Sequence, residues 1–436
     1  MAATKSRSRL TVTFTSDITP THEEAEKAKS GDKGKTEGGR KSKVWEYIAL
    51  ATVPLVLVLG NSMLVPVLPT LRRELAISQF QSSLVISLFS ISAAIIIPFA
   101  GYLSDRFSRK AVIIPSLIIY GGAGILAGFG AVWDSYGVLI SARALQGIGA
   151  AGTAPIAMAL VGDMYKDGQE SQALGLIEAS NGAGKVISPI LGALLALIVW
   201  YAAFFAFPAF CALSLLAIIF LIKEPKRQQE PKPIREYIRS IRKIFAKHGR
   251  WLISSFFSGS LALFILFGVL FFLSNILEDK PYSIAGVRKG FVLAIPLFGM
   301  VTTAYITGTV IRKNGVLMRW LMNIGLIMMV VSLALAIWFN SNLYVFIGLL
   351  TVSSIGTGLL LPCLNTMITG AVEKAERGMI TSLYSSLRFF GVAFGPPLFG
   401  WMMSVSHRMV FMTVSILSLV ALGLVFFLVK PGKQVQ

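Results

Sequence analysis

Residues 148–155 read Ile148-Gly-Ala-Ala-Gly-Thr-Ala-Pro155, and 207 positions later residues 355–362 read Ile355-Gly-Thr-Gly-Leu-Leu-Leu-Pro362. The same offset, without a gap, relates Gly101 to Gly308, Gly184 to Gly391 and Pro189 to Pro396. Each landmark lies in or beside a long apolar segment, so the repeated unit is a bundle of membrane helices. Two parallel bundles in one chain are the architecture of an alternating-access transporter, which handles its substrate between the halves.

The composition agrees with a membrane protein, because 55% of the residues are hydrophobic, only 14% are charged, and the mean hydropathy is +0.72. A bilayer core about 30 Å thick requires roughly 20 apolar residues per spanning helix. The sequence therefore predicts an all-α protein with twelve transmembrane helices in two pseudo-symmetric six-helix bundles. The predicted spans are 47–68, 82–101, 111–133, 137–161, 173–197, 200–222, 252–275, 290–311, 317–338, 343–369, 380–402 and 409–429.

The remaining segments set the predicted domain organisation. Residues 1–44 are rich in Lys, Glu, Gly, Ser and Thr and lack apolar periodicity, so we expect a disordered cytoplasmic tail. Residues 45–222 form the N-terminal bundle and residues 251–430 the C-terminal bundle. Residues 223–250 link them in the cytoplasm, and residues 431–436 form a second cytoplasmic tail.

The linker contains an amphipathic pattern. Its apolar residues fall on one helical face, and they are Ile234, Tyr237, Ile238, Ile241, Ile244 and Phe245. Its basic residues fall on the other faces, and they are Arg239, Arg242, Lys243 and Lys247. This pattern suits a helix on the anionic inner leaflet of the lipid bilayer. A helix that binds a partner protein is the alternative.

The basic residues predict the orientation. With the N-terminus inside, cytoplasmic segments carry 30 of the 40 Lys and Arg residues. The outer loops carry Arg72, Arg73, Lys280, Arg288, Lys289 and Arg408. By the positive-inside rule both termini are cytoplasmic, and we expect a multi-pass protein of the plasma membrane. The net charge of +19 then reflects topology, so we expect no nucleic-acid partner.

The sequence predicts neither an enzyme nor a metal site. Cys211 and Cys363 lie in separate predicted helices, which indicates neither a disulfide nor a thiolate metal site. His22, His248 and His407 lie in tail or loop segments, and no nucleophile–base spacing accompanies them. No nucleotide-binding loop or cofactor motif is present either, so the energy source we expect is the proton gradient.

Three motifs identify a family. The first is Gly101-Tyr-Leu-Ser-Asp105-Arg106-Phe-Ser-Arg109-Lys110, and the second is Arg143-x-x-Gln146-Gly147-x-Gly149-Ala150-Ala151. Both resemble conserved elements of the major facilitator superfamily. The third, Gly175-x8-Gly184-x3-Ser188-Pro189-x2-Gly192-Ala193, resembles the signature of its drug:proton antiporters. Ser108, Ser188 and Ala193 replace family glycines.

The resemblance implies roles for these residues. Gly101, Asp105, Arg106 and Arg109 form a gating loop, in which Asp105 closes the inner gate against the cytoplasmic start of the eleventh span, around Met379–Ile380. The partial positive charge of a helix N-terminus favours a carboxylate at that place. Gly184, Pro189 and Gly192 serve conformational change.

Arg143 is the other charged residue to which the resemblance gives a role. The resemblance places it in proton handling, close to Gln146. A snorkelling arginine that serves only topology is the alternative.

The fifth predicted span carries Glu178, Asn181 and Lys185 at i, i+3 and i+7, hence on one helical face. Desolvation and neighbouring cations act in opposite directions on a carboxyl group there, and their balance can allow proton exchange. We predict Glu178 as the titrating group, with Arg143 and Lys185 as its partners in proton coupling. A structural ion pair is the alternative.

The predicted substrate cavity is lined by polar residues of several spans, namely Asn61, Gln146, Asn181, Asn365 and Arg388. Buried cations outnumber buried acids, which favours an anionic or catecholate-like substrate such as a siderophore.

The predicted function is export of a small amphiphilic compound (a drug, siderophore or metabolite) in exchange for protons, by a monomer. A proton symporter or facilitator that imports an organic anion is one alternative. A non-transporting receptor or scaffold is another.

Overall fold

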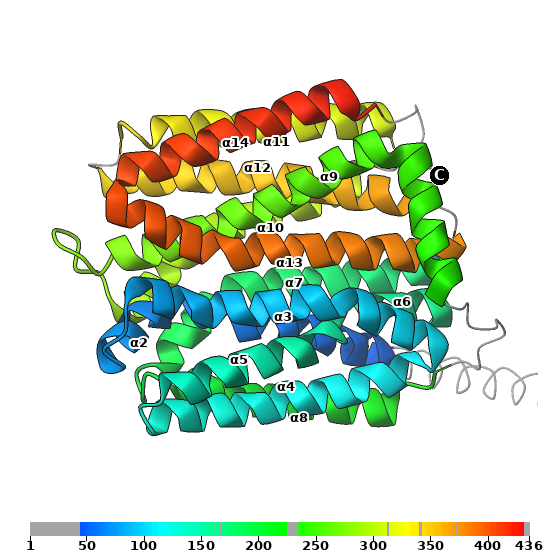
Figure 1. Ribbon diagram of the computed structural model, residues 1–436, viewed down its shortest axis with the longest axis horizontal. Helices are drawn as coiled ribbons and strands as arrows, with labels where there is room; N and C mark the ends of the chain where they lie inside the picture. The colour runs from blue at the N-terminus through cyan, green and yellow to red at the C-terminus, as the bar shows by residue number, and fades with distance from the viewer. Residues whose placement is uncertain are drawn as a thin grey trace, which may run out of the picture. The chain divides into compact units, whose positions relative to one another are not determined.

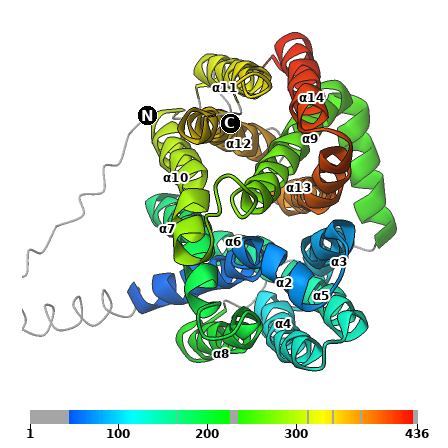
Figure 2. The same ribbon diagram turned by 90° about the vertical axis from the view of Figure 1, so that its left-hand side faces the viewer.

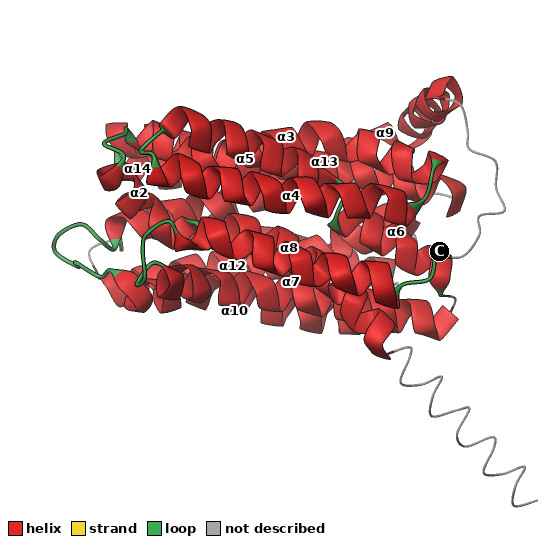
Figure 3. Cartoon of the chain, turned by 90° about the horizontal axis from the view of Figure 1, so that it is seen from below, coloured by secondary structure: helices red, strands yellow, loops and turns green. Residues whose placement is uncertain are grey.

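The computed structural model describes residues 44–165, 167–224, 234–311, 314–339, 342–370 and 374–430. Almost all of the described residues are helical, and short loops join the helices at their ends (Figure 3). The all-α expectation is therefore confirmed. The predicted tails, apart from Val44, lie outside the described residues.

The helices of the first half follow the predicted spans. The first span, Val44–Glu74, ends in η1 (Val65–Val67) and α2 (Leu68–Glu74). It is followed by α3 (Gln79–Arg106), α4 (Arg109–Val132), α5 (Tyr136–Ala151), α6 (Ala154–Met164), α7 (Asp167–Leu195) and α8 (Ala202–Leu221). The predicted fourth span is divided into α5 and α6, and α6 starts with Pro155 in its first turn, where the missing N–H is tolerated.

The second half repeats this order. Its helices are α9 (Ile234–Ile276), α10 (Gly286–Ile311), α11 (Gly315–Leu335), α12 (Leu343–Gly370), α13 (Lys374–Val405) and α14 (His407–Leu428). Three equivalent pairs, α3 and α10, α5 and α12, and α7 and α13, start 207 positions apart. The offset found between landmark residues therefore also relates helix boundaries.

Ten helical segments of the described chain are long and apolar enough to cross a membrane. The other two predicted spans are α7 and α13, which have 29 and 32 residues. Both are long enough, but they carry polar residues within the span, with Glu178, Asn181 and Lys185 in α7 and Arg388 in α13. The two equivalent helices of the repeat are therefore the least apolar ones.

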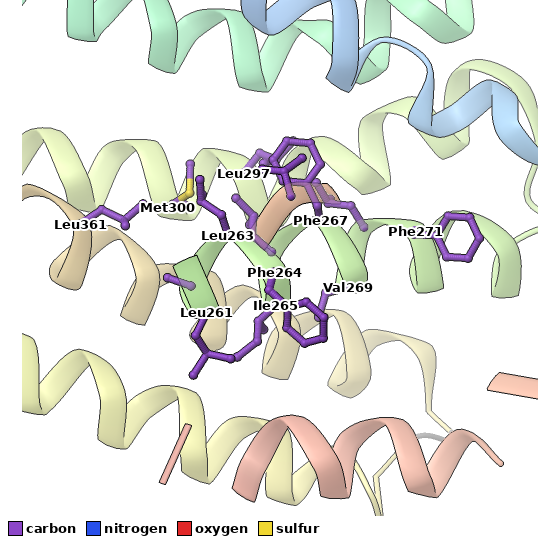
Figure 4. Close-up of a cluster of buried hydrophobic side chains, with 14 of the residues drawn as sticks. Leu261, Leu263, Phe264, Ile265, Phe267, Val269, Phe271, Leu297, Met300 and Leu361 are labelled. Atoms are coloured by element: carbon purple, nitrogen blue, oxygen red, sulfur yellow. The ribbon is translucent and has the colours of Figure 1, made fainter. Parts of the chain in front are cut away.

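The helices run in nearly the same direction across Figure 1, and Figure 2 views them close to end-on. In that view α4, α5 and α8 lie on one side and α11, α12 and α14 on the other. The main packing between the two halves is α3 against α13 and α7 against α10. Buried apolar side chains of α9, α10 and α12 form part of the largest hydrophobic cluster, which Figure 4 shows around Leu263, Phe267 and Met300.

Glycines let equivalent helices approach closely in both halves. A Cβ atom on Gly149 would lie 2.6 Å from the backbone nitrogen of Tyr120 in α4, and one on Gly356 would lie 2.4 Å from the carbonyl oxygen of Gly325 in α11. Small residues at such positions bring helix backbones into van der Waals contact, which is a main source of helix association in membranes.

The predicted linker helix is not separate, because α9 runs continuously for 43 residues from Ile234 into the seventh span. Its first part turns across the ends of the other helices (Figure 1). Ile244 is buried, and Phe245 packs edge-on against Phe256. The protein's own core thus covers part of the predicted apolar face, while Ile238 stays 47% exposed.

Replacing Gly192 by Ala should destabilise the protein, because the added Cβ would lie 2.0 Å from the carbonyl oxygen of Met63 in the first span. Overpacking of this kind costs about 1–3 kcal/mol. Gly175→Ala is the matched control in the same helix, since no atom lies within 4 Å of its Cβ position. We expect a lower unfolding temperature for Gly192→Ala in detergent and an unchanged or higher one for Gly175→Ala. Equal temperatures would contradict the close contact.

Candidate functional site: charged groups between and within the two halves

The predicted gating loop is organised around Arg109, which is 8% exposed. Its guanidinium pairs with Asp105 of α3 and with Asp163 of α6, each at 2.8 Å, and it donates to the hydroxyl of Ser104 at 2.7 Å. One side chain thus ties together the end of α3, the start of α4 and the end of α6.

The chain after α8 closes the same cluster. The carboxylate of Glu224 accepts hydrogen bonds from the backbone N–H groups of Arg109, at 2.6 Å, and Lys110, at 3.0 Å. A carboxylate at a helix N-terminus meets the unpaired N–H groups and the positive end of the dipole. Ser108, which departs from the family glycine, caps α4 by accepting from Ala111 N–H. Its backbone is extended, so glycine is not required there.

The other loop residues lie at the surface or against the second half. Asp105 is about one-third exposed and paired with Arg109, and Arg106 donates to the hydroxyl of Tyr102 at 3.4 Å. A Cβ on Gly101 would lie 2.7 Å from the hydroxyl of Ser382 in α13, so this part of α3 touches the second half.

Asp105 was expected to face the N-terminus of the eleventh span, around Met379–Ile380. The helix α13 begins more than one turn earlier, at Lys374, and Met379 and Ile380 lie buried inside it. The N-terminus of this helix is therefore not at the residues that were expected to meet Asp105.

Arg143 in α5 is fully buried and is the centre of a hydrogen-bond network in the first half. It donates to the carbonyl oxygens of Val85, at 2.8 Å, and Gly60, at 3.2 Å. It also donates to the side-chain oxygens of Gln146 and, at 3.4 Å, Asn61. Its acceptors therefore come from the first span, α3 and α5.

None of the described carboxylates forms an ion pair with Arg143. Its charge is instead stabilised by four hydrogen bonds and by the ring of Phe89, whose centroid lies 4.5 Å from the guanidinium carbon. Asn61 and Gln146, predicted as cavity residues, are both buried and bound to Arg143. Among the polar side-chain atoms of Asn61 and Gln146, only the Gln146 amide nitrogen is left without a partner.

The polar face of α7 lies between two packed faces. Ser180 donates to the carbonyl oxygen of Ala51 in the first span at 2.7 Å, and a Cβ on Gly182 would meet Val301 of α10 at 2.7 Å. Helical geometry places Glu178, Asn181 and Lys185 between these contacts. Glu178 is exposed and Lys185 is half-buried.

Lys185 of α7 and Arg388 of α13 are two cations from opposite halves. Arg388 repels the Lys185 ammonium, and Glu178 attracts it. Within the described ranges Lys185 makes no hydrogen bond or ion pair.

Arg388 is incompletely paired. Its Nη1 lies 3.5 Å from the Asn365 side-chain oxygen, its carbon lies 5.4 Å from the ring centre of Tyr384, and its Nε is buried without a partner. The pair formed by Lys185 and Arg388, called the cation pair below, therefore has unused donors.

Sequence reasoning missed a second charged cluster, which lies at the opposite ends of the helices. Glu278, just after α9, accepts from Arg73 of α2 at 2.5 Å and from Lys289 of α10. The positive-inside count treated both cations as residues of outer loops. Nothing in the local pattern indicates that Lys289 is 1% exposed or that Arg73 comes from the other half, because both facts depend on tertiary packing.

The sequence profile of the Major Facilitator Superfamily matches residues 50–321 and 283–436. The chain belongs to the major facilitator superfamily. The resemblance inferred from the three motifs is confirmed, and the chain is a membrane transporter rather than an enzyme.

Curated relatives match nearly the whole chain. The chain is 44% identical over 391 residues to the bacillibactin exporter of Bacillus subtilis (strain 168), covering 89% of this chain and 97% of that protein. It is 28% identical over 375 residues to multidrug resistance protein 1 of the same organism, covering 84% and 92%. The exporter function predicted from the antiporter signature is therefore confirmed, against an importer or a scaffold.

Solved structures show the same fold. The human organic anion transporter MFSD10 (TETRAN) gives a TM-score of 0.69 at 20% identity, covering 88% of this chain and 99% of that one. A bacterial homolog of the human lysosomal transporter Spinster gives 0.66 at 16% identity, covering 88% and 96%.

Replacing Arg143 by Lys should reduce transport at least about tenfold. An ammonium keeps the charge but cannot reach acceptors on three helices at once, and each charge-assisted hydrogen bond lost is worth about 1.5–3 kcal/mol. Arg319→Lys is the control, because Arg319 donates to one backbone carbonyl, of Phe426, at an exposed site. Transport in vesicles and the unfolding temperature measure both effects. Wild-type transport by Arg143→Lys would exclude a need for the fork-shaped guanidinium.

Proposed function

We propose that this major facilitator superfamily exporter carries an iron-free siderophore out of the cell in exchange for protons. The observation that carries the proposal is the cation pair, in which donors of both halves remain unused. Siderophores bind ferric iron through acidic oxygen donors, and such oxygens are the natural acceptors for an ammonium and a guanidinium. The 44% identical relative, named a bacillibactin exporter, supports the same substrate class.

Glu178 is the proposed proton site. Among the side chains that the structure describes, it is the one carboxylate well inside a predicted span rather than at its end. It acts electrostatically on Lys185, so the proton site and the cation pair are coupled.

The electrostatic coupling between Glu178 and the cation pair restricts which substrates can be exchanged for protons. A purely anionic ligand would bind more tightly when Glu178 is protonated, because protonation removes a negative charge. Proton and ligand would then bind together, which gives symport. Antiport requires competition between proton and substrate. A siderophore without iron supplies it, since an acidic hydroxyl can donate to ionised Glu178 while other oxygens accept from Lys185 and Arg388. Protonation of Glu178 removes the acceptor and releases the substrate.

In the proposed cycle, residues 45–222 rock against residues 251–430 and expose the site to each side in turn. Siderophore enters from the cytoplasm as Glu178 loses its proton, and the outer proton displaces it on the other side. The exporter relatives favour the plasma membrane, with both termini cytoplasmic. One chain holds both halves, so a monomer suffices.

The multidrug relatives support a second candidate, export of varied amphiphilic drugs. The cation pair argues against lipophilic cations, because a cationic drug would approach two uncompensated positive charges. A cationic dye is therefore an informative comparison substrate.

Glu178→Gln should abolish coupling. In everted vesicles energised acid-inside, added iron-free siderophore should dissipate the pH gradient with wild type and with the control Glu236→Gln, whose carboxylate is exposed on the linker part of α9. Glu178→Gln should give no dissipation, as followed by a pH-sensitive dye. An equal response from both variants would remove Glu178 from the coupling step, and no response from wild type would exclude siderophore antiport.

Lys185→Gln and Arg388→Gln should each weaken siderophore binding about tenfold to a hundredfold, which is the loss of one hydrogen bond to a charged group. Binding to the purified protein can be followed by tryptophan fluorescence, with Arg319→Gln as the control. A cationic dye should bind no more weakly to either variant. Unchanged siderophore affinity in both variants would contradict the role of the cation pair.

A further inference from the structure

The carboxylate of Glu278 joins the two halves at their outer ends. One of its oxygens lies 2.5 Å from a guanidinium nitrogen of Arg73, and the other accepts from the ammonium of Lys289. The side chains of Glu278 and Lys289 are only 8% and 2% exposed, whereas that of Arg73 is 58% exposed. Arg73 also donates to the hydroxyl of Thr70 at 3.2 Å, one turn earlier in α2, which holds its direction.

Other contacts close the same side. The hydroxyl of Ser274 in α9 donates to the carbonyl oxygen of Val65 in η1 at 2.8 Å, and Gln79 of α3 donates to the sulfur of Met403 in α13 at 3.6 Å. A Cβ on Gly290 of α10 would lie 2.8 Å from the carbonyl oxygen of Pro189 in α7. The end of the first span contributes Met63, Leu64, Val65, Leu68 and Leu71 to the same buried cluster as α9.

Together these contacts join the first span, α2 and α7 of the first half to α9, α10 and the connection between them in the second half, so the structure has its outer side sealed. A transporter that alternates access must break the outer contacts once in every cycle.

We propose that Glu278, Arg73 and Lys289 form a latch that holds the outer side closed. Glu278 and Lys289 both belong to the second half and stay together when the halves separate, so Lys289 holds the carboxylate in position. Arg73 belongs to the first half and moves away. Because Arg73 is more than half exposed, water replaces its contact with Glu278, and the latch opens and recloses reversibly.

The alternative role is purely structural, with Glu278 and Lys289 folding the connection between α9 and α10 and Arg73 adding nothing. The two roles differ in what Arg73 does. A latch requires Arg73 for closure, whereas a structural pair does not.

The accessibility of Ser274 separates them, because Ser274 is 0% exposed when the outer side is closed. The reporter is Ser274→Cys in a protein whose buried cysteines, Cys211 and Cys363, are replaced by Ala. A membrane-impermeant maleimide is applied from outside to intact cells or right-side-out vesicles at fixed pH. Arg408→Cys, at an exposed position in the first turn of α14, reports maleimide access that does not depend on the latch.

Arg73→Gln and Glu278→Gln should each raise the labelling rate of the Ser274→Cys reporter at least threefold. The neighbouring Arg72→Gln and the Arg408→Cys reporter should show no change. Arg73→Gln is decisive if Glu278→Gln fails to fold, since Arg73 is exposed and its loss leaves the buried pair intact. An unchanged rate in Arg73→Gln would overturn the latch.

Reversal of all three charges, Arg73→Glu with Glu278→Lys and Lys289→Glu, tests the pairing itself. The triple variant should return labelling toward the wild-type rate, whereas Arg73→Glu alone should raise it. Labelling that stays high in a folded triple variant would show that the three residues act separately, and would also overturn the latch.

Discussion

The first half is built around a buried positive charge that none of the described carboxylates neutralises. Moving an ion from water into a protein interior carries a large free-energy cost unless hydrogen bonds replace its hydration. Arg143 meets this requirement with acceptors on three helices and with the ring of Phe89. The relative positions of the first span, α3 and α5 are therefore set by one guanidinium. A change of conformation within the first half would leave that charge unpaired, so the half is expected to move as a unit.

The second half repeats the helices but not this network. Its partly buried guanidinium, Arg388, comes from α13, the repeat partner of α7. Its Nε is unpaired, and it acts electrostatically on Lys185 of the other half. The two guanidinium groups therefore differ in how completely they are hydrogen-bonded. Arg143 is hydrogen-bonded to acceptors of its own half. Lys185 and Arg388 keep unused donors, which are available to a ligand between the halves. This asymmetry separates the groups that keep a half rigid from the groups that can serve a substrate.

Much of the fold could be predicted from the sequence, because bilayer thickness and the repeat offset act on the whole chain. The landmark offset even predicts equivalent starts for α3 and α10. The polar stripe of α7 was also found, since helical spacing alone places Glu178 and Lys185 on one face.

The side-chain partners could not be predicted in the same way. Asn61 and Gln146 were assigned to the cavity because they are polar residues in apolar spans. Gln146 was also expected close to Arg143, but the hydrogen bond from Arg143 to Asn61 was not expected. Ser108 was counted as a departure from the family, whereas it caps α4. The cluster around Glu278 joins residues 205 positions apart, and no local pattern carries that information.

The hydrogen bonds of Glu224 also change what the connection between the halves can do. Because this carboxylate is held by the first backbone amides of α4, the covalent tether between the halves begins at Glu224 and not at the end of α8. Ten peptide steps separate Glu224 from Ile234, where α9 begins, and they reach at most about 35 Å. A pull on this tether acts on the start of α4, beside Asp105 and Arg109, before it reaches α8. A movement of the linker is therefore transmitted through Glu224 to the start of α4, and so to the loop between α3 and α4.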